Sequence, residues 1–74
     1  MISIQCLVIY EKVNGNVIGI WEDHKNNTLQ SIYKNNEDKL NQYSQIILNI
    51  GSDIVSSKFN YRITNEQIVL KDDL

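Results

Sequence analysis

An alternating apolar stretch near the start of the chain reads ISIQCLVIY, at residues 2–10. Successive side chains of a β-strand point to opposite faces, so this period-two pattern predicts a strand. One of its faces consists of Ile2, Ile4, Cys6, Val8 and Tyr10. Because Leu7 and Ile9 make the opposite face apolar as well, we expect other elements to cover both faces of this strand.

A turn signal follows the strand at Asn14-Gly15, before a second apolar run at residues 17–21. Asn and Gly tolerate the positive φ angles that a two-residue type I′ turn needs at its central positions. The two apolar runs and the turn between them therefore predict an N-terminal β-hairpin.

The register of this hairpin depends on which residues form its loop. A two-residue Asn-Gly loop places Val8 opposite Trp21 and lets Tyr10 cover the bare backbone of Gly19. Moving the loop by one residue pairs Tyr10 with Trp21 instead. The sequence leaves the choice between these registers open.

The middle of the chain combines a polar loop with short apolar segments. Residues 22–28 are all polar and predict a loop, and residues 29–33 predict a third short strand. Residues 35–38, Asn-Asn-Glu-Asp, resemble a helix start with an Asn cap, because the acidic residues Glu37 and Asp38 follow where the positive end of a helix dipole lies. We expect a helix to begin here.

Two structures fit the segment after this helix start, and they differ over residues 44–50. The apolar residues from Leu40 to Ile50 have the spacing of one long amphipathic helix, which Gly51 would end. Alternatively, a short helix ends at about Tyr43 and a buried strand follows, since a compact run of β-branched residues suits a sheet. We favour the short helix and the strand.

The end of the chain predicts a second hairpin. Apolar and polar residues alternate at 59–63 and at 67–70, on either side of Thr64-Asn65-Glu66. The order of hairpin, short helix, strand and hairpin is typical of an α+β fold with a mostly antiparallel β-sheet. A chain of 74 residues is too short for two domains, so we expect a single small domain over residues 1–74.

Composition argues against enzymatic, metal-binding and nucleic-acid functions. The chain holds one Cys, one His, three Gly and no Pro, and its net charge is −2. A structural zinc site needs about four Cys or His ligands, and the glycines are too scattered to form a phosphate-binding loop. Asp72 and Asp73 are too few for an oxygen cage around a hard cation. The acidic chain also lacks the basic groove that accompanies base stacking, so we expect no catalytic residues, no cofactor or metal, and no nucleic-acid partner.

His24 and Cys6 are the side chains with chemistry of their own. His24 follows Glu22 and Asp23, and a neighbouring carboxylate can orient an imidazole as a general base. No Ser or Cys nucleophile accompanies it, so we interpret this segment as a solvated loop. Cys6 lies on the apolar face of the first strand, where burial raises the pKa of a thiol and makes it unreactive.

Cys6 also bears on the compartment. A lone Cys cannot form an intramolecular disulfide, which favours a reducing environment. The N-terminal residues lack the basic region of a signal peptide, and the longest apolar run, residues 6–10, is too short to cross a bilayer. We expect neither secretion by a signal peptide nor membrane insertion.

Assembly with other proteins is the use that this pattern favours. A small protein with two hairpins and apolar residues on both faces of its sheet leaves strand edges and apolar surface for a partner to cover. Trp21 is the first candidate for an interface anchor, because Trp is enriched at interaction hot spots, and Tyr10 and Tyr33 complete the candidate interface. The alternative places Trp21 in the protein's own core. We expect other protein subunits as partners, in a homo-oligomer or a larger assembly.

Three segments resemble small structural proteins of tailed bacteriophages. Residues 7–18, LVIYEKVNGNVI, resemble the hairpin that begins many of these proteins. Residues 36–43 and 61–69 are similar to the helix and terminal strands of tail, baseplate or fibre-associated proteins. The resemblance implies a non-enzymatic virion component without an active site.

A second hypothesis places the chain in another functional class. It is a small phage-encoded inhibitor that binds a host defence or regulatory protein, for which small size and slight acidity are suitable. The first hypothesis places the chain in the virion, and the second places it in the host cytoplasm.

Overall fold

The computed structural model describes residues 3–71 and shows a small α+β fold with antiparallel sheets, as predicted. In chain order its elements are β1 (Ser3–Glu11), β2 (Val17–Trp21), α1 (Leu29–Ile32), α2 (Glu37–Gln42), β3 (Tyr43–Gly51), α3 (Ser52–Ser56), the 3-10 helix η1 (Lys58–Asn60), β4 (Tyr61–Thr64) and β5 (Gln67–Leu70). The described residues therefore hold three short α-helices where the sequence predicted one. Ile2, Asp72 and Asp73, which entered the sequence predictions, lie outside the described residues.

The middle strand of the main sheet is β1, and the strand order is β2-β1-β3. Both neighbours run antiparallel to β1, and β3 pairs with it from Ser3 opposite Gly51 to Glu11 opposite Tyr43. Four consecutive β1 residues, from Cys6 to Ile9, are at most 1% exposed. Because consecutive side chains point to opposite faces, the predicted covering of both faces is confirmed.

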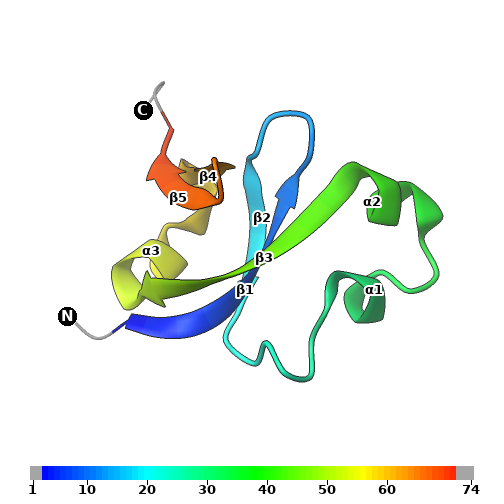
Figure 1. The fold of residues 1–74 in the computed structure, drawn as a ribbon, viewed down its shortest axis with the longest axis horizontal. Coiled ribbons are helices and arrows are strands. Elements are labelled where there is room, and N and C mark those ends of the chain that lie inside the picture. Colours follow the sequence, from blue (N-terminus) through cyan, green and yellow to red (C-terminus); the bar gives the residue numbers. More distant parts are fainter. Residues whose placement is uncertain (1–2, 72–74) are drawn as a thin grey trace.

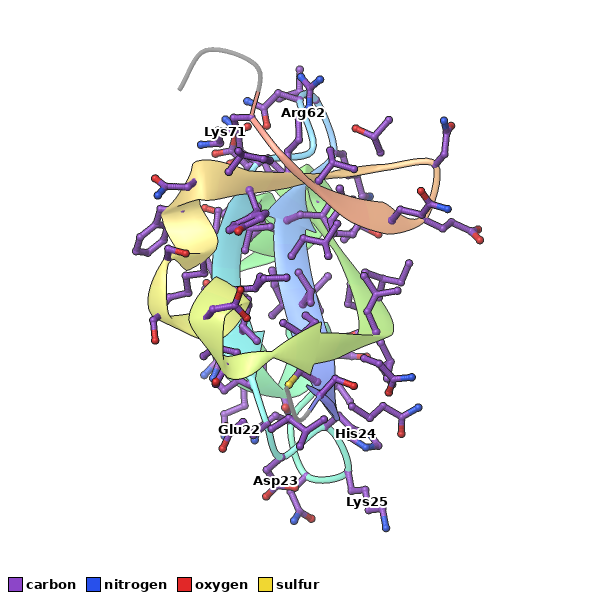
Figure 2. The ribbon with its side chains drawn as sticks, turned by 90° about the vertical axis from the view of Figure 1, so that its left-hand side faces the viewer. Glu22, Asp23, His24, Lys25, Arg62 and Lys71 are labelled. Carbon is purple, nitrogen blue, oxygen red and sulfur yellow. The ribbon has the colours of Figure 1, made fainter. Side chains whose placement is uncertain are left out.

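The C-terminal elements cover one face of this sheet. A buried cluster there joins Cys6 and Val8 of β1 with Ile50 of β3 and Ile63 of β4. Half-buried residues of α3, β4 and β5 pack against the cluster, namely Ile54, Val55, Tyr61 and Ile68. Figure 2 shows the β4–β5 hairpin crossing over one end of the main sheet.

Leu7 and Ile9 face the opposite side of the sheet, where the ring of Trp21 lies across Gly19. The side chain that covers this glycine is therefore Trp21, and the prediction that Tyr10 covers it is wrong. Tyr10 packs instead against the buried cluster on the first face. α1 and α2 lie at the other end of the molecule from α3 and the β4–β5 hairpin (Figure 1).

The N-terminal hairpin forms as predicted, but its loop is wider than a type I′ turn. Glu11 N donates to Asn16 O over 3.0 Å, so the loop spans residues 12–15. Gly15 has a φ of 80°, whereas the positive-φ residues of the described chain do not include Asn14. The side-chain oxygen of Asn14 accepts a hydrogen bond from Asn16 N at 2.8 Å. This local bond stabilises a turn conformation other than the one that Asn-Gly favours in two-residue loops.

The register of the hairpin matches neither of the predicted ones. Leu7 lies opposite Trp21 and Ile9 opposite Gly19, and an irregularity after Ile9 then brings Tyr10 opposite Val17. A β-bulge places two residues of one strand against one of the other, so it changes the pairing within a single hairpin. A register derived from loop length alone therefore fails here.

Residues 29–32 form α1, and the prediction of a third strand at 29–33 is wrong. The hydroxyl oxygen of Thr28 accepts a hydrogen bond from Ser31 N at 3.1 Å, and Ser31 Oγ accepts one from Thr28 N at 2.8 Å. This reciprocal capping box satisfies amides that a strand would have to pair with a neighbouring strand.

The helix start predicted at residues 35–38 is confirmed, and the structure identifies Asn36 as the cap, since its side-chain oxygen accepts a hydrogen bond from Lys39 N at 3.1 Å. α2 ends at Gln42 and β3 begins at Tyr43, which confirms the short helix followed by a strand. The compact β-branched run therefore decides the structure of this segment, and the helical spacing of its apolar residues does not.

The second hairpin is confirmed too, although its first strand begins at Tyr61 and not at residue 59, because residues 58–60 form η1. Its turn has the type I′ geometry that was predicted for the first hairpin. Asn65 and Glu66 have φ angles of 53° and 63° between the paired residues Thr64 and Gln67. Positive φ at both central positions of a two-residue loop defines a type I′ turn.

Candidate interaction surface

The main sheet has two edges, and β2 forms the one that has no exposed residue. The 3-10 helix η1 and the strand β4 both contact β2. Asn16 forms a β-bridge with Arg62, and Ile63 N donates to Gly15 O over 2.7 Å. The C-terminal hairpin is thus joined to the turn beside β2 by backbone hydrogen bonding.

The other edge belongs to β3, and two hydrogen bonds show which of its backbone groups face outward. Glu11 N donates to Asn16 O, on the β2 side of β1, whereas Lys12 N donates to Gln42 O, on the β3 side. Backbone groups along a strand alternate in direction, so even-numbered residues of β3 bond to β1 and odd-numbered residues face away. The outward-facing residues at the centre of the strand are Gln45, Ile47 and Asn49.

These outward-facing backbone groups have no hydrogen-bond partner within residues 3–71. We call the outward side of Gln45, Ile47 and Asn49 the free edge of β3. Each exposed N–H or C=O on such an edge can bond to a strand from another molecule.

The side chains of β3 leave this edge unprotected. The strand reads YSQIILNIG, with no charged residue and no Pro, although 22% of the whole chain is charged. Ile47 is 45% exposed, and its pairing with β1 continues without a bulge on either side. Natural sheet edges are usually blocked by charges, prolines or bulges, so an edge without them is a surface for strand pairing.

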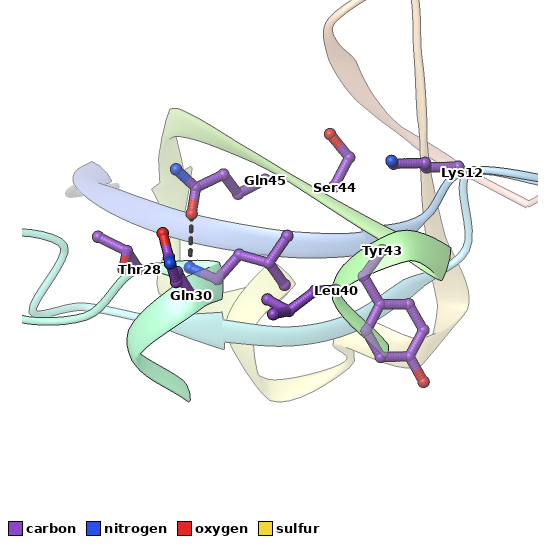
Figure 3. Close-up of a pocket in the computed structure, with 8 residues that line it drawn as sticks. Lys12, Thr28, Gln30, Leu40, Tyr43, Ser44 and Gln45 are labelled. Carbon is purple, nitrogen blue, oxygen red and sulfur yellow. Dashed lines mark hydrogen bonds between the residues drawn. The ribbon is translucent and has the colours of Figure 1, made fainter. Parts of the chain in front are cut away.

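An open cavity of about 560 Å³ lies beside the start of this edge (Figure 3). α1 is held against β3 there, because Leu29 N donates to the Gln45 side-chain oxygen over 2.6 Å. The residues that line the cavity are Lys12, Thr28, Leu29, Gln30, Leu40, Tyr43, Ser44 and Gln45. None of these has a carboxylate, imidazole or thiol group, so the cavity can receive a side chain of a partner but offers no acid–base pair.

The structure places the three predicted interface residues in separate parts of the molecule. Trp21 is half-buried over Gly19, and Tyr10 is half-buried against the core. The ring centre of Tyr33 lies 5.5 Å from that of Tyr43 and 5.7 Å from Lys39 Nζ. Their contact with a partner stays a prediction.

The sequence interpretation predicted exposed strand edges but did not identify β3 as the strand that forms the free edge. The signal available in the sequence was the nine-residue run without charge or Pro at Tyr43–Gly51. Such a run also suits a central strand, and only the strand order shows that it lies at an edge.

The loop around His24 holds the Asp23 carboxylate in hydrogen bonds to Asn26. The Asn26 side-chain nitrogen lies 2.9 and 3.2 Å from the two carboxylate oxygens, and Asn26 N lies 3.3 Å from one of them. The side-chain hydrogen bond from Asn26 is the main reason that the pKa of Asp23 is lowered. Figure 2 shows Asp23 and His24 in the loop at the opposite end of the molecule from Arg62.

The single thiol is buried in the core. Cys6 is fully buried, and its Sγ lies 3.6 Å from the carbonyl oxygen of Ile4. Burial, followed by the negative charge of Glu22, raises the pKa of the Cys6 thiol. The thiolate, which is the reactive form, is therefore disfavoured in the folded protein.

Three further findings complete the description of the site. Among residues 3–71, no group of three or more His, Cys, Asp or Glu side chains is placed to hold a metal ion. No helix in the described part of the chain is both long and apolar enough to cross a membrane. Comparisons with models of protein families, with curated proteins and with solved structures found no match.

Proposed function

We propose that this protein is a non-enzymatic structural component of a tailed-bacteriophage particle, in the tail, the baseplate or a fibre-associated position. It acts through protein–protein contacts. The observation that carries the proposal is the free edge of β3, where outward-facing backbone groups lie beside a half-exposed Ile47. The resemblance of residues 7–18 to phage structural proteins supports the choice of particle.

An assembly subunit has a use for such an edge. Strand addition supplies several backbone hydrogen bonds in one defined orientation, and alternate side chains add specificity. The cavity beside Gln45 offers a place for a side chain of the added element. The surface thus has the components of strand-based recognition without those of catalysis.

A density-gradient separation of a lysate from the native source tests this role, with the chain followed by mass spectrometry. We expect the chain to migrate with a large particle and to stay there at high salt, since salt screens backbone and apolar contacts less than surface ion pairs. Recovery only in the light soluble fractions would contradict the structural role. That result would favour the inhibitor hypothesis, and the host protein that travels with the chain would then be identified.

A matched pair of variants connects the particle to the edge. Ile47→Lys places a charge on the free edge, whereas Val13→Lys places the same charge on a loop residue that is 89% exposed. We expect Ile47→Lys to be absent from the particle and Val13→Lys to be present in it. Equal retention of both would show that the chain joins the particle through another surface.

A further inference from the structure

We infer that the free edge of β3 pairs with the same edge of a second copy of this chain, antiparallel, with Ile47 opposite the partner's Ile47. The inference rests on the proposed function and deepens it by naming one partner and its contact. The pairing joins two three-stranded sheets into one continuous sheet across a twofold axis.

The outward-facing side chains select this register. Outward-facing residues pair with outward-facing residues, so the axis passes through a residue of β3, and residues 46, 47 and 48 give the three registers with the most paired residues. With the axis at Ile47, Gln45 lies opposite the partner's Asn49. The side-chain nitrogen of Gln45 can donate to the side-chain oxygen of that Asn49, while the Gln45 oxygen keeps the hydrogen bond from Leu29 N. With the axis at either neighbouring residue, Ile47 lies opposite an amide side chain. The central register alone pairs apolar with apolar and amide with amide.

The other face of the sheet favours the same register. The pairing brings Ile46 opposite the partner's Leu48, and Leu48 opposite the partner's Ile46. Both side chains are only half-buried in a single copy, although they pack against its buried cluster. The dimer therefore extends the apolar core on this face across the axis, and burial of apolar surface favours association.

The shape of the sheet sets the extent of this contact. β3 curves along its length (Figure 1), so its ends turn away from a partner strand and residues 45–49 form the pairing segment. The β2 edge does not compete, because η1 and β4 contact that strand and none of its residues is exposed, whereas Gln45, Ile47 and Asn49 of β3 are exposed. The second copy supplies an edge of matching length and side-chain pattern.

Disulfide cross-linking of full-length variants tests the register. Two residues in a hydrogen-bonded antiparallel pair have Cα atoms about 5.5 Å apart, within the range for a disulfide. We expect Ile47→Cys to form a covalent dimer under mild oxidation at least about ten times faster than Val13→Cys, since Val13 lies in the loop and collides at random. The native Cys6 is fully buried and does not contribute. Equal rates for the two variants would overturn the proposal.

A mixing experiment excludes the neighbouring registers. Gln45→Cys alone cannot cross-link, because in the central register it lies about 13 Å along the strand from the partner's residue 45. We expect a covalent heterodimer when Gln45→Cys is mixed with Asn49→Cys. Homodimers of Gln45→Cys, with no heterodimer on mixing, would contradict the register.

Sedimentation of the unmodified chain measures the dimer itself. We expect a concentration-dependent dimer, a Kd at least about tenfold weaker for Ile47→Lys and no change for Val13→Lys, because two lysines then face each other across the axis. If Ile47→Lys fails to fold, Asn49→Lys replaces it, since Asn49 is exposed and also belongs to the free edge. A wild-type chain that stays monomeric and does not cross-link at residue 47 would overturn the pairing.

The two proposals fail in different experiments. A chain that migrates with the particle but never pairs through Ile47 keeps the structural role and loses the self-pairing. A chain that forms the predicted dimer but stays in the light fractions keeps the self-pairing and loses the structural role.

Discussion

The two edges of the main sheet differ in strand length, in regularity of pairing and in exposure. The β2 edge belongs to a five-residue strand whose pairing with β1 is irregular, and η1 and β4 contact it. The β3 edge belongs to a nine-residue strand with a regular register and no charged residue. Short helices contact β3 as well, yet Gln45, Ile47 and Asn49 are exposed, whereas no residue of β2 is exposed.

This difference shows which part of the sheet the small hydrophobic core covers. A chain of this size buries a modest fraction of its surface, so covering both edges is costly in chain length. The residues after β3 cross to the β2 side, where Ile63 joins the buried cluster and its N–H bonds to Gly15. The proposed function supplies a partner for this edge, since an unprotected edge otherwise invites aggregation.

The largest effect is expected where the C-terminal hairpin meets the turn beside β2. We expect Gly15→Val to lower the free energy of unfolding by about 3 kcal/mol or more. Gly15 has a φ of 80°, and a Cβ there would collide with the carbonyl oxygen of Ile63. Urea unfolding followed by circular dichroism measures the loss.

Val13→Ala is the matched control for that substitution. Val13 lies in the same loop and is 89% exposed, so we expect a change within about 0.5 kcal/mol. A comparable loss in both variants would mean that the loop as a whole, and not the contact between Gly15 and Ile63, sets the stability of this edge.

A second prediction compares one side chain from each edge strand. Val17 of β2 is 2% exposed and Ile47 of β3 is 45% exposed. We expect Val17→Ala to cost about 2 kcal/mol and Ile47→Ala less than about 1 kcal/mol, because only the first leaves a cavity. The measurement is urea unfolding at a concentration low enough to keep both chains monomeric. Equal losses would show that the β3 edge is already part of the core and would remove the contrast between the edges.

Local patterns in the sequence predicted much of the fold because they report on local interactions. The alternation in β1, the Asn36 cap and the two hairpins all appear in the structure. The type I′ turn lies at Asn65-Glu66 and not at Asn14-Gly15, because the Asn14 side chain bonds to Asn16 N and supports a wider loop. Local hydrogen bonds between side chain and backbone also favour a helix at residues 29–32, because Thr28 and Ser31 cap its first turn.

The candidate surface was harder to predict, because it depends on strand order. The apolar run of β3 is visible in the sequence, but its two sides become different only when β1 is placed between β2 and β3. Trp21 suggested an interface by residue type, yet its ring lies over Gly19. Ile47 gives no such signal by type, and its exposure follows from where its strand lies.

A third prediction strengthens the element that covers the β2 edge. Glu66 has a φ of 63°, a conformation that costs a residue with a Cβ about 1 kcal/mol or more. We expect Glu66→Gly to raise the free energy of unfolding by about 0.5–1 kcal/mol, since Gly suits the second position of a type I′ turn. Gln67→Gly, one residue further and inside β5, should instead destabilise by a similar amount. Thermal unfolding of the two variants gives the sign, and a loss in both would show that the turn is not strained at Glu66.

The smallest effect is expected in the loop that leads from the β2 edge to α1. The pKa of Asp23 is lowered in the folded protein, mainly by the hydrogen bond from the Asn26 side chain. The folded state therefore binds this proton less readily than the unfolded chain, so the contribution to stability is present above the ordinary pKa of Asp and is lost as the pH falls through the lowered value. The carboxylate is exposed to solvent, which keeps the contribution small.

Asn26→Ala removes the donor and should flatten the acid side of the curve of melting temperature against pH. Asn41→Ala, an exposed residue of α2, should move the whole curve without changing its shape. An unchanged acid limb in Asn26→Ala would show that the hydrogen bond between Asn26 and Asp23 does not stabilise the loop. The position of α1 after this loop would then depend on the capping box at Thr28 and on the hydrogen bond from Leu29 N to the Gln45 side chain.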